Sequence, residues 1–396
     1  MSNQPFAVEE IKNVPNIQGA RIIAVGIGGG GGNMIGHMIR ENVTGIEMMV
    51  VNTDAQALQN SPAEKKVQIG VKLTKGLGAG MKPEVGQESA LENEEEIRAE
   101  LQGADIVFIS AGLGGGTGTG AAPVVARIAK DVGALTVSVV TKPFQFEGKK
   151  RNRLALEGLE ALKAESDSIV VIPNEKLISI IDRKAGLKDS FKIVDSVLAQ
   201  AVKGTSGIIL SSGVDDINVD FNDLKTVMSY KGMALMGVGE HQGENAAYEA
   251  IKTAIESPLL DNISINGAMG VLVHFQLHPN FPFMEIQEAM NIVYESADED
   301  ADVIFGTSTD EALAEDYVKI TIVATGFEKN VANNTGFEST ENVVMQEPTV
   351  SQQQTINTQE TTLSGRPRKI VGSDIGTFEY DPNSLDTPAY YRHRQD

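Results

Sequence analysis

The chain has 396 residues, of which 41% are hydrophobic, and this is enough for two packed domains. Its 33 lysines and arginines against 54 aspartates and glutamates give a formal net charge of −21; such a surface repels polyanions, so we expect no binding to nucleic acid or to anionic lipid. The absence of cysteine excludes disulfides and thiolate chemistry, and no apolar run approaches the ~20 residues of a membrane span, so we expect no direct membrane insertion.

Residues 1–20 carry Glu9, Glu10 and Pro15 and have no apolar core segment, and we interpret them as a short disordered arm. From Arg21 onward, short runs rich in valine and isoleucine alternate with helical stretches. Runs of this kind are typical of strands buried on both faces, which predicts an α/β domain with a largely parallel sheet. The predicted strands are 22–25, 46–51, 106–109, 135–140 and 169–172, and the predicted helices are 33–41, 84–101, 120–132 and 148–164.

A long helix is predicted at 189–203, where apolar residues share one stripe, and Gly204 lies just past its expected end. A smaller α/β region should follow it. Its predicted helices are 221–229, 244–256 and 284–294, and its predicted strands are 270–276, 302–305 and 317–324. From about residue 328, polar residues dominate and cannot bury a core, so we expect a flexible linker.

Two glycine-rich segments carry the strongest chemical signal. Residues 24–33 and 110–120 each follow a predicted strand and precede a predicted helix. Glycines let phosphate oxygens approach the backbone closely, and the amides at a helix start then donate to the anion. Two such segments at the carboxyl ends of parallel strands can converge on one polyphosphate.

The first segment alone also satisfies a dinucleotide fingerprint, Gly26-x-Gly28-x-x-Gly31, with the acidic Asp54 after the next strand. A nicotinamide-dependent oxidoreductase is therefore an alternative, although it leaves the second segment unexplained. No P-loop motif occurs in the sequence. We expect no metal site built from side chains, because the histidines at 274 and 278 lie in or after a strand, where that spacing does not converge.

Gly114-Gly-Gly-Thr-Gly-Thr-Gly120 is similar to the signature of the tubulin/FtsZ superfamily of GTPases. Further segments resemble the FtsZ family in the right order, at 51–58, 74–80, 141–144, 146–151, 172–174 and 218–223. The resemblance covers roughly 21 to 327, and residues 386–392 are similar to the family's C-terminal peptide. Met269, Thr387, Tyr390 and Tyr391 depart from the family pattern, which leaves partner binding open.

Phe191 and Asp195 are four residues apart on the long helix, so they share a face. A ring beside a carboxylate suits guanine, which offers two donors to the carboxylate; a core phenylalanine beside a solvated aspartate is the alternative. The resemblance implies guanine recognition by Asp195 and a ribose contact from Glu147. The residues assigned to the nucleotide are Gly29, Gly30, Gly31, Gly32, Asn33, Gly78, Ala79, Gly80, Gly112, Gly115, Gly116, Thr117, Gly118, Thr119, Glu147, Arg151, Asn174, Phe191 and Asp195.

Asn218, Asp220 and Asp223 lie at the start of a predicted helix, far along the chain from the glycine segments. Helix capping is the alternative interpretation. The resemblance implies that this loop reaches the GTP of the next subunit. Asp220 and Asp223 would polarise the attacking water, Asn218 would orient it, and Mg²⁺ bound through the phosphates would neutralise their charge.

The resemblance thus implies a tubulin-like fold and a filament-forming GTPase, in the cytoplasm at the midcell division ring. Residues 386–394 would dock a membrane adaptor or division regulators, unless they are only a disordered tail. A polymer that binds nucleotide without hydrolysing it is a further alternative. The expected parts are an arm at 1–20, a GTP-binding domain at 21–187, a central helix and connector at 188–211, a GTPase-activating domain at 212–327, a linker at 328–385 and a docking peptide at 386–396.

Overall fold

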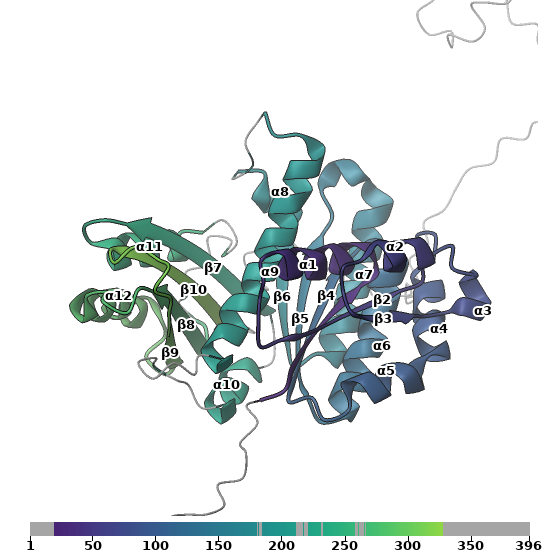
Figure 1. Ribbon diagram of the computed structural model, residues 1–396, viewed down its shortest axis with the longest axis horizontal. Helices are drawn as coiled ribbons and strands as arrows, with labels where there is room; N and C mark the ends of the chain where they lie inside the picture. Colours follow the sequence, from purple (N-terminus) through teal and green to yellow (C-terminus); the bar gives the residue numbers. More distant parts are fainter. Residues whose placement is uncertain are drawn as a thin grey trace, which may run out of the picture. The chain divides into compact units, whose positions relative to one another are not determined.

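The computed structural model describes residues 20–179, 181, 184–210, 217, 221–230, 233–257, 260, 265 and 267–327 (Figure 1). The predicted arm apart from Ala20, the predicted linker and the predicted docking peptide lie outside these residues, as do Asn218 and Asp220. None of the described helices is both long and apolar enough to cross a membrane.

A parallel sheet forms the first half of the fold. Its strands are β1 (Ile22–Ile27), β2 (Glu47–Asn52), β3 (Lys65–Gln68), β4 (Ile106–Gly112), β5 (Leu135–Lys142) and β6 (Ser168–Pro173), in the order β3-β2-β1-β4-β5-β6. The five strands predicted from apolar runs are confirmed. Strand β3 was not predicted, because Val67 is its one apolar residue.

Helices cover both faces of this sheet. They are α1 (Gly28–Arg40), α2 (Ala55–Asn60), α3 (Val71–Thr74), α4 (Pro83–Glu92), α5 (Glu94–Leu101), α6 (Thr117–Asp131), α7 (Lys149–Glu165) and α8 (Asn174–Leu177), with a 3₁₀ turn η1 (Gln145–Glu147). One apolar cluster joins the sheet to α1, and a second joins the opposite face to α5 and α6. The predicted helix 84–101 is two helices, because the backbone of Asn93 leaves the helical conformation, with φ −112° and ψ 24°; its side chain accepts the amide of Gly70 at 2.9 Å.

The long helix α9 (Leu187–Leu210) continues past Gly204, so the predicted end at Gly204 was wrong. A Cβ on Gly204 would lie 2.5 Å from Cγ2 of Thr321. This glycine therefore allows α9 to pack closely on the neighbouring strand and does not stop the helix.

The second half of the fold extends the same sheet. It contains α10 (Phe221–Met228), β7 (Met233–Gln242), α11 (Ala246–Ile255), β8 (Gly270–Leu277), α12 (Phe283–Ser296), β9 (Asp302–Thr309) and β10 (Tyr317–Thr325), with the strand order β7-β10-β8-β9. Strand β7 was missed. Its Gly237 and Gly239 weaken the strand pattern, but a Cβ on either would lie 2.0 Å from a carbonyl oxygen of α11.

Strand direction separates two edges of the sheet. Strand β7 runs parallel to β6, while β10 is antiparallel to both β7 and β8, so β10 alone among the described strands runs against the rest. The end of β10 therefore lies at the amino edge, where the other strands begin. There, the Thr325 hydroxyl donates to the Val227 carbonyl at 2.8 Å, which places the C-terminal end of α10 at the amino edge.

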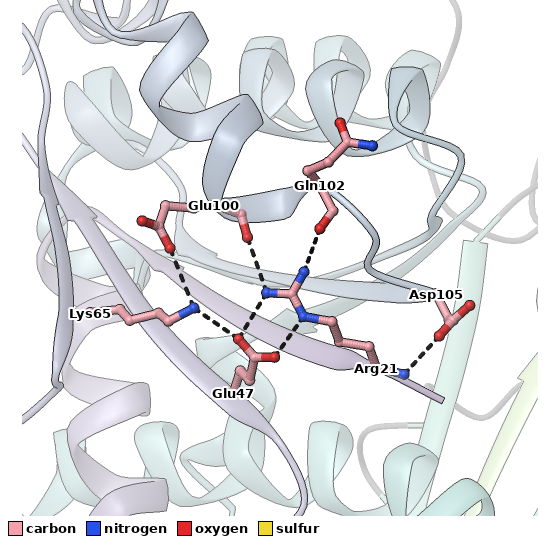
Figure 2. A network of polar contacts seen from close by, with 6 residues as sticks. All are labelled: Arg21, Glu47, Lys65, Glu100, Gln102 and Asp105. Carbon is pink, nitrogen blue, oxygen red and sulfur yellow. Dashed lines mark hydrogen bonds and ion pairs between the residues drawn. The ribbon is translucent and has the colours of Figure 1, made fainter. Parts of the chain in front are cut away.

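A network of charges ties the strand starts together at this amino edge (Figure 2). The Arg21 guanidinium donates from Nε to Oε1 of Glu47 at 2.6 Å and from Nη2 to Oε2 at 3.0 Å. Lys65 Nζ lies 2.9 Å from the same carboxylate and 3.3 Å from Glu100. The hydrogen bond from Arg21, with further support from Lys65 against the opposing effect of burial, lowers the pKa of Glu47 to about 2.

We predict that Glu47→Gln lowers the free energy of unfolding at pH 7 by on the order of 1 kcal/mol, a modest value because both partners are about one third exposed. The lowered pKa means that this stabilisation is present above the ordinary value of 4.5 and is lost as the pH falls toward about 2. Urea unfolding of the parent protein and of Glu47→Gln, measured from pH 7 to pH 3, should show the difference between their free energies of unfolding becoming smaller. Glu64→Gln, which removes an exposed carboxylate at the same edge, is the control. A gap that stays constant with pH would contradict the assignment.

Candidate functional site

The first glycine segment forms the opening turn of α1. The helix begins at Gly28, not at Asn33 as predicted, and no side chain caps its start. The amides of this turn therefore have no partner within the helix, and the positive end of the helix dipole lies with them at the carboxyl end of β1. This arrangement binds anions.

The second glycine segment lies directly against the first. A Cβ on Gly28 would lie 3.0 Å from the Gly118 amide nitrogen, and one on Gly30 would lie 3.0 Å from the Gly112 amide nitrogen. Any side chain at these positions would push the segments apart. The structure thus brings together the two segments that the sequence singled out, at the carboxyl ends of β1 and β4.

The third predicted segment, 78–80, borders the second one. A Cβ on Gly116 would lie 2.7 Å from Cβ of Ala79. Behind them, the Thr53 and Thr117 hydroxyls are 2.7 Å apart, which links the end of β2 to the start of α6. Three stretches of chain thus converge around the start of α6.

Thr119 supports the second glycine segment. Its side chain is buried, and its hydroxyl oxygen accepts the amide of Gly114 at 2.8 Å. Thr119 therefore holds the second glycine segment in shape. A Cβ on Gly114 would lie 2.7 Å from the Arg151 carbonyl, so the first turn of α7 also supports this segment.

Glu147 and Arg151 lie together beside this segment. One carboxylate oxygen of Glu147 accepts the Phe144 amide at 2.9 Å, and the other pairs with the Arg151 guanidinium. The pair is only partly exposed. It fixes the turn between β5 and α7 and holds a cation near the glycine segments.

A large hollow opens between α1 and α9, with a volume of about 1080 Å³. Gly29, Gly32 and Asn33 line it from α1, and Phe191 and Asp195 line it from α9. This α1/α9 hollow confirms that Phe191 and Asp195 share a face. The Phe191 ring meets Phe144 edge-on, with centroids 5.7 Å apart, which fixes its orientation.

Two polar groups near the glycine segments are poorly satisfied by the described residues. Burial raises the pKa of Asp195 to about 6, and Arg40 opposes the shift. The Asn174 side chain, at the start of α8, is 4% exposed, and its Oδ1 has no hydrogen-bond partner among the described residues. A buried acceptor without a partner is costly, so a ligand that donates to it is favoured.

Asp223 is not brought to this site. It is exposed on the first turn of α10 and does not line the α1/α9 hollow. Figure 1 shows α10 at the bottom of the view and α8, which follows β6 at the carboxyl edge, at the top. Asn218 and Asp220 lie outside the described residues.

Sequence reasoning missed the basic residues that line the same hollow, Arg40, Lys188 and Lys192. The signal for the two lysines was available, because Lys188, Lys192 and Asp195 recur at helical spacing on α9. Arg40 gave no such signal, since it reaches the hollow through the packing of α1 on α9. Among the described residues, no group of three or more histidine, aspartate and glutamate side chains could hold a metal ion.

Comparisons with known proteins show the family of this chain. The GTPase-domain model of the Tubulin/FtsZ family matches residues 21–182, and the C-terminal-domain model of the FtsZ family matches residues 232–328. The chain is 46% identical to the cell division protein FtsZ of Helicobacter pylori over 334 residues, which cover 84% of this chain and 86% of that protein. The chain belongs to the FtsZ family.

Solved structures agree with this FtsZ assignment. An FtsZ dimer from M. jannaschii matches with a TM-score of 0.74 and 48% identity, over 78% of this chain and 89% of that one. A CetZ2 protofilament from Haloferax volcanii matches with a TM-score of 0.67, 78% of this chain and 94% of that one, and its 21% identity shows the shared fold alone. As a member of the FtsZ family, the chain is a GTPase of bacterial cell division that binds GTP and GDP.

We predict that the carboxyl carbon of Asp195, followed by NMR in the nucleotide-free protein, titrates with a pKa of about 6. Arg40→Met should raise this pKa further, because Arg40 favours the ionised carboxylate. Arg153→Met, which removes an exposed cation on α7, is the control and should leave it unchanged. A titration near the ordinary value of 3.8, or no response to Arg40→Met, would contradict the burial of this carboxylate.

Proposed function

We propose that each copy of this FtsZ-family chain holds GTP at its own glycine segments and that the next copy completes the active site. The glycine amides at the start of α1 and in the second segment receive the phosphates, and Mg²⁺ carried by the phosphate oxygens neutralises their charge when bound. Residues 78–80 close the phosphate side, beside Gly116.

The base and ribose contacts follow from the unpartnered groups. Asp195, when ionised, accepts from the two donors of guanine, and the oriented Phe191 ring stacks on the base. Asn174 supplies its free Oδ1 as a further acceptor. Glu147 contacts the ribose, and Arg151, held by Glu147, offsets phosphate charge.

One observation carries the shared active site: the glycine segments lie at the carboxyl edge of the sheet, whereas α10 ends at the amino edge. Asp223 therefore cannot reach the nucleotide of its own chain without refolding. A second copy stacked along the strand direction would bring its Asp223, with Asn218 and Asp220, to the first copy's nucleotide. Such a contact is heterologous and need not close, so it builds an open filament.

Each part of the chain then has its own role. Residues 21–187 bind GTP, 188–211 connect, and 212–327 activate hydrolysis in the neighbour. We further propose that the filament acts in the cytoplasm at the midcell division ring. Residues 386–394, on the linker 328–385, dock a membrane adaptor or a division regulator.

Complementation between two inactive variants tests the shared site. Asp223→Ala should bind GTP but not turn it over, and Asp195→Asn should fail to bind GTP, because it replaces an acceptor by a donor. Mixed at equal amounts, they should recover up to about a quarter of the parent phosphate release, the share of contacts that pair a GTP-holding copy with an intact Asp223.

The control for Asp223→Ala is Glu288→Ala, which removes an exposed carboxylate on α12 instead. It should keep full turnover alone. Filaments of the mixture that sediment but release no phosphate would place the whole active site within one copy.

The dependence of rate on concentration gives a second test. The water-activating carboxylates of one copy do not reach its own nucleotide. Phosphate release per molecule should therefore rise steeply above the concentration at which filaments sediment and stay near zero below it. A rate per molecule that does not change on dilution would contradict hydrolysis between copies.

A further inference from the structure

A second hollow lies at the amino edge, where α1 ends beside the starts of β2 and β3. It has a volume of about 470 Å³ and a lining of both apolar and polar side chains. Ile39, Val43 and Met48 pack against the core with one side and are half-buried, so their other sides remain open. At the rim, Glu47 pairs with both Lys65 and Arg21, and Glu64 is exposed. We call this the α1-end hollow.

We propose that the α1-end hollow is the docking site of the chain's own N-terminal arm, residues 1–19, which binds there through Val14, Pro15 and Ile17. Sequence reasoning expected this arm to be disordered. It supplies apolar side chains that can pack on the half-buried Ile39, Val43 and Met48, and Pro15 brings no amide hydrogen that would need a partner.

The position of Ala20 directs the arm to this hollow. Ile22 belongs to the apolar cluster that includes α1, whereas the Arg21 side chain reaches the Gln102 carbonyl on the opposite face. Side chains alternate along an extended chain, so Ala20 returns to the face of α1. Residue 23 pairs with Glu47 of β2, so the arm joins the sheet next to the strand whose start forms the hollow.

The reach of the arm is sufficient. Adjacent strands lie roughly 5 Å apart, so the starts of β2 and β3 are within about 10 Å of the start of β1. An extended chain covers about 10 Å from Ala20 to Ile17, three residues away, and about 20 Å from Ala20 to Val14, six residues away.

Covalent attachment favours the arm over a free partner of similar chemistry. A segment tethered by a few residues has an effective concentration in the millimolar range. Even weak apolar burial then keeps the hollow covered, and the covered hollow presents no apolar surface to other molecules.

The lack of cysteine in the chain permits a direct test by cross-linking. One variant carries Val14→Cys with Thr44→Cys, which is exposed at the rim of the hollow. The matched variant carries Val14→Cys with Gln102→Cys, which is exposed on the other face and whose carbonyl accepts the Arg21 side chain. Without nucleotide, a short bismaleimide should cross-link the Thr44→Cys variant within one chain at least ten times faster than the Gln102→Cys variant.

The apolar contact is tested within the arm, where a substitution leaves the folded part intact. Adding Ile17→Asp should remove the preference for Thr44→Cys, and adding Gln18→Asp, the same charge one residue later, should retain it. Equal cross-linking rates for the two pairs would overturn the proposal. Products that join two chains would overturn it as well, because they would assign the hollow to another copy.

Discussion

The contact between the two glycine segments is the constraint on which the site depends. Amide nitrogens of the second segment lie 3.0 Å from where a Cβ on Gly28 or Gly30 of the first segment would be, so side chains at these two positions would push the segments apart. The close contact also brings the amides at the starts of α1 and α6 to one place at the carboxyl edge of the sheet. Thr119 and the first turn of α7 hold this arrangement from behind, through Gly114.

The parallel sheet gives the molecule two unlike edges. Helix starts and their unpaired amides gather at the carboxyl edge, and the charge network of Arg21, Glu47 and Lys65 closes the amino edge (Figure 2). The second half of the fold continues this polarity, because β7, β8 and β9 run with β6. The glycine segments proposed to bind GTP therefore lie at one edge, and the helix bearing Asp223 ends at the other.

Helix α9 contacts both halves of the fold. Its first turns bring Phe191 and Asp195 to the hollow beside α1, and its later turns pack through Gly204 on β10. Burial of Asp195 raises its pKa, so the free carboxylate is poorly solvated and gains from donors on a base. In the function proposed above, the helix that recognises the base therefore also contacts the half of the fold that acts on the neighbouring copy.

Sequence alone determined what local pattern and composition encode: the apolar runs of β1, β2, β4, β5 and β6, the two glycine segments, the pair Phe191 and Asp195, and the family. It missed β3 and β7, where polar residues or glycines interrupt the strand pattern, and it ended α9 at Gly204. Only the tertiary structure decided the rest, because contacts between segments far apart in the chain produce no periodic pattern in the sequence. Those contacts turn Gly204 into a packing position, bring Arg40 to Asp195 and separate Asp223 from the glycine segments of its own chain.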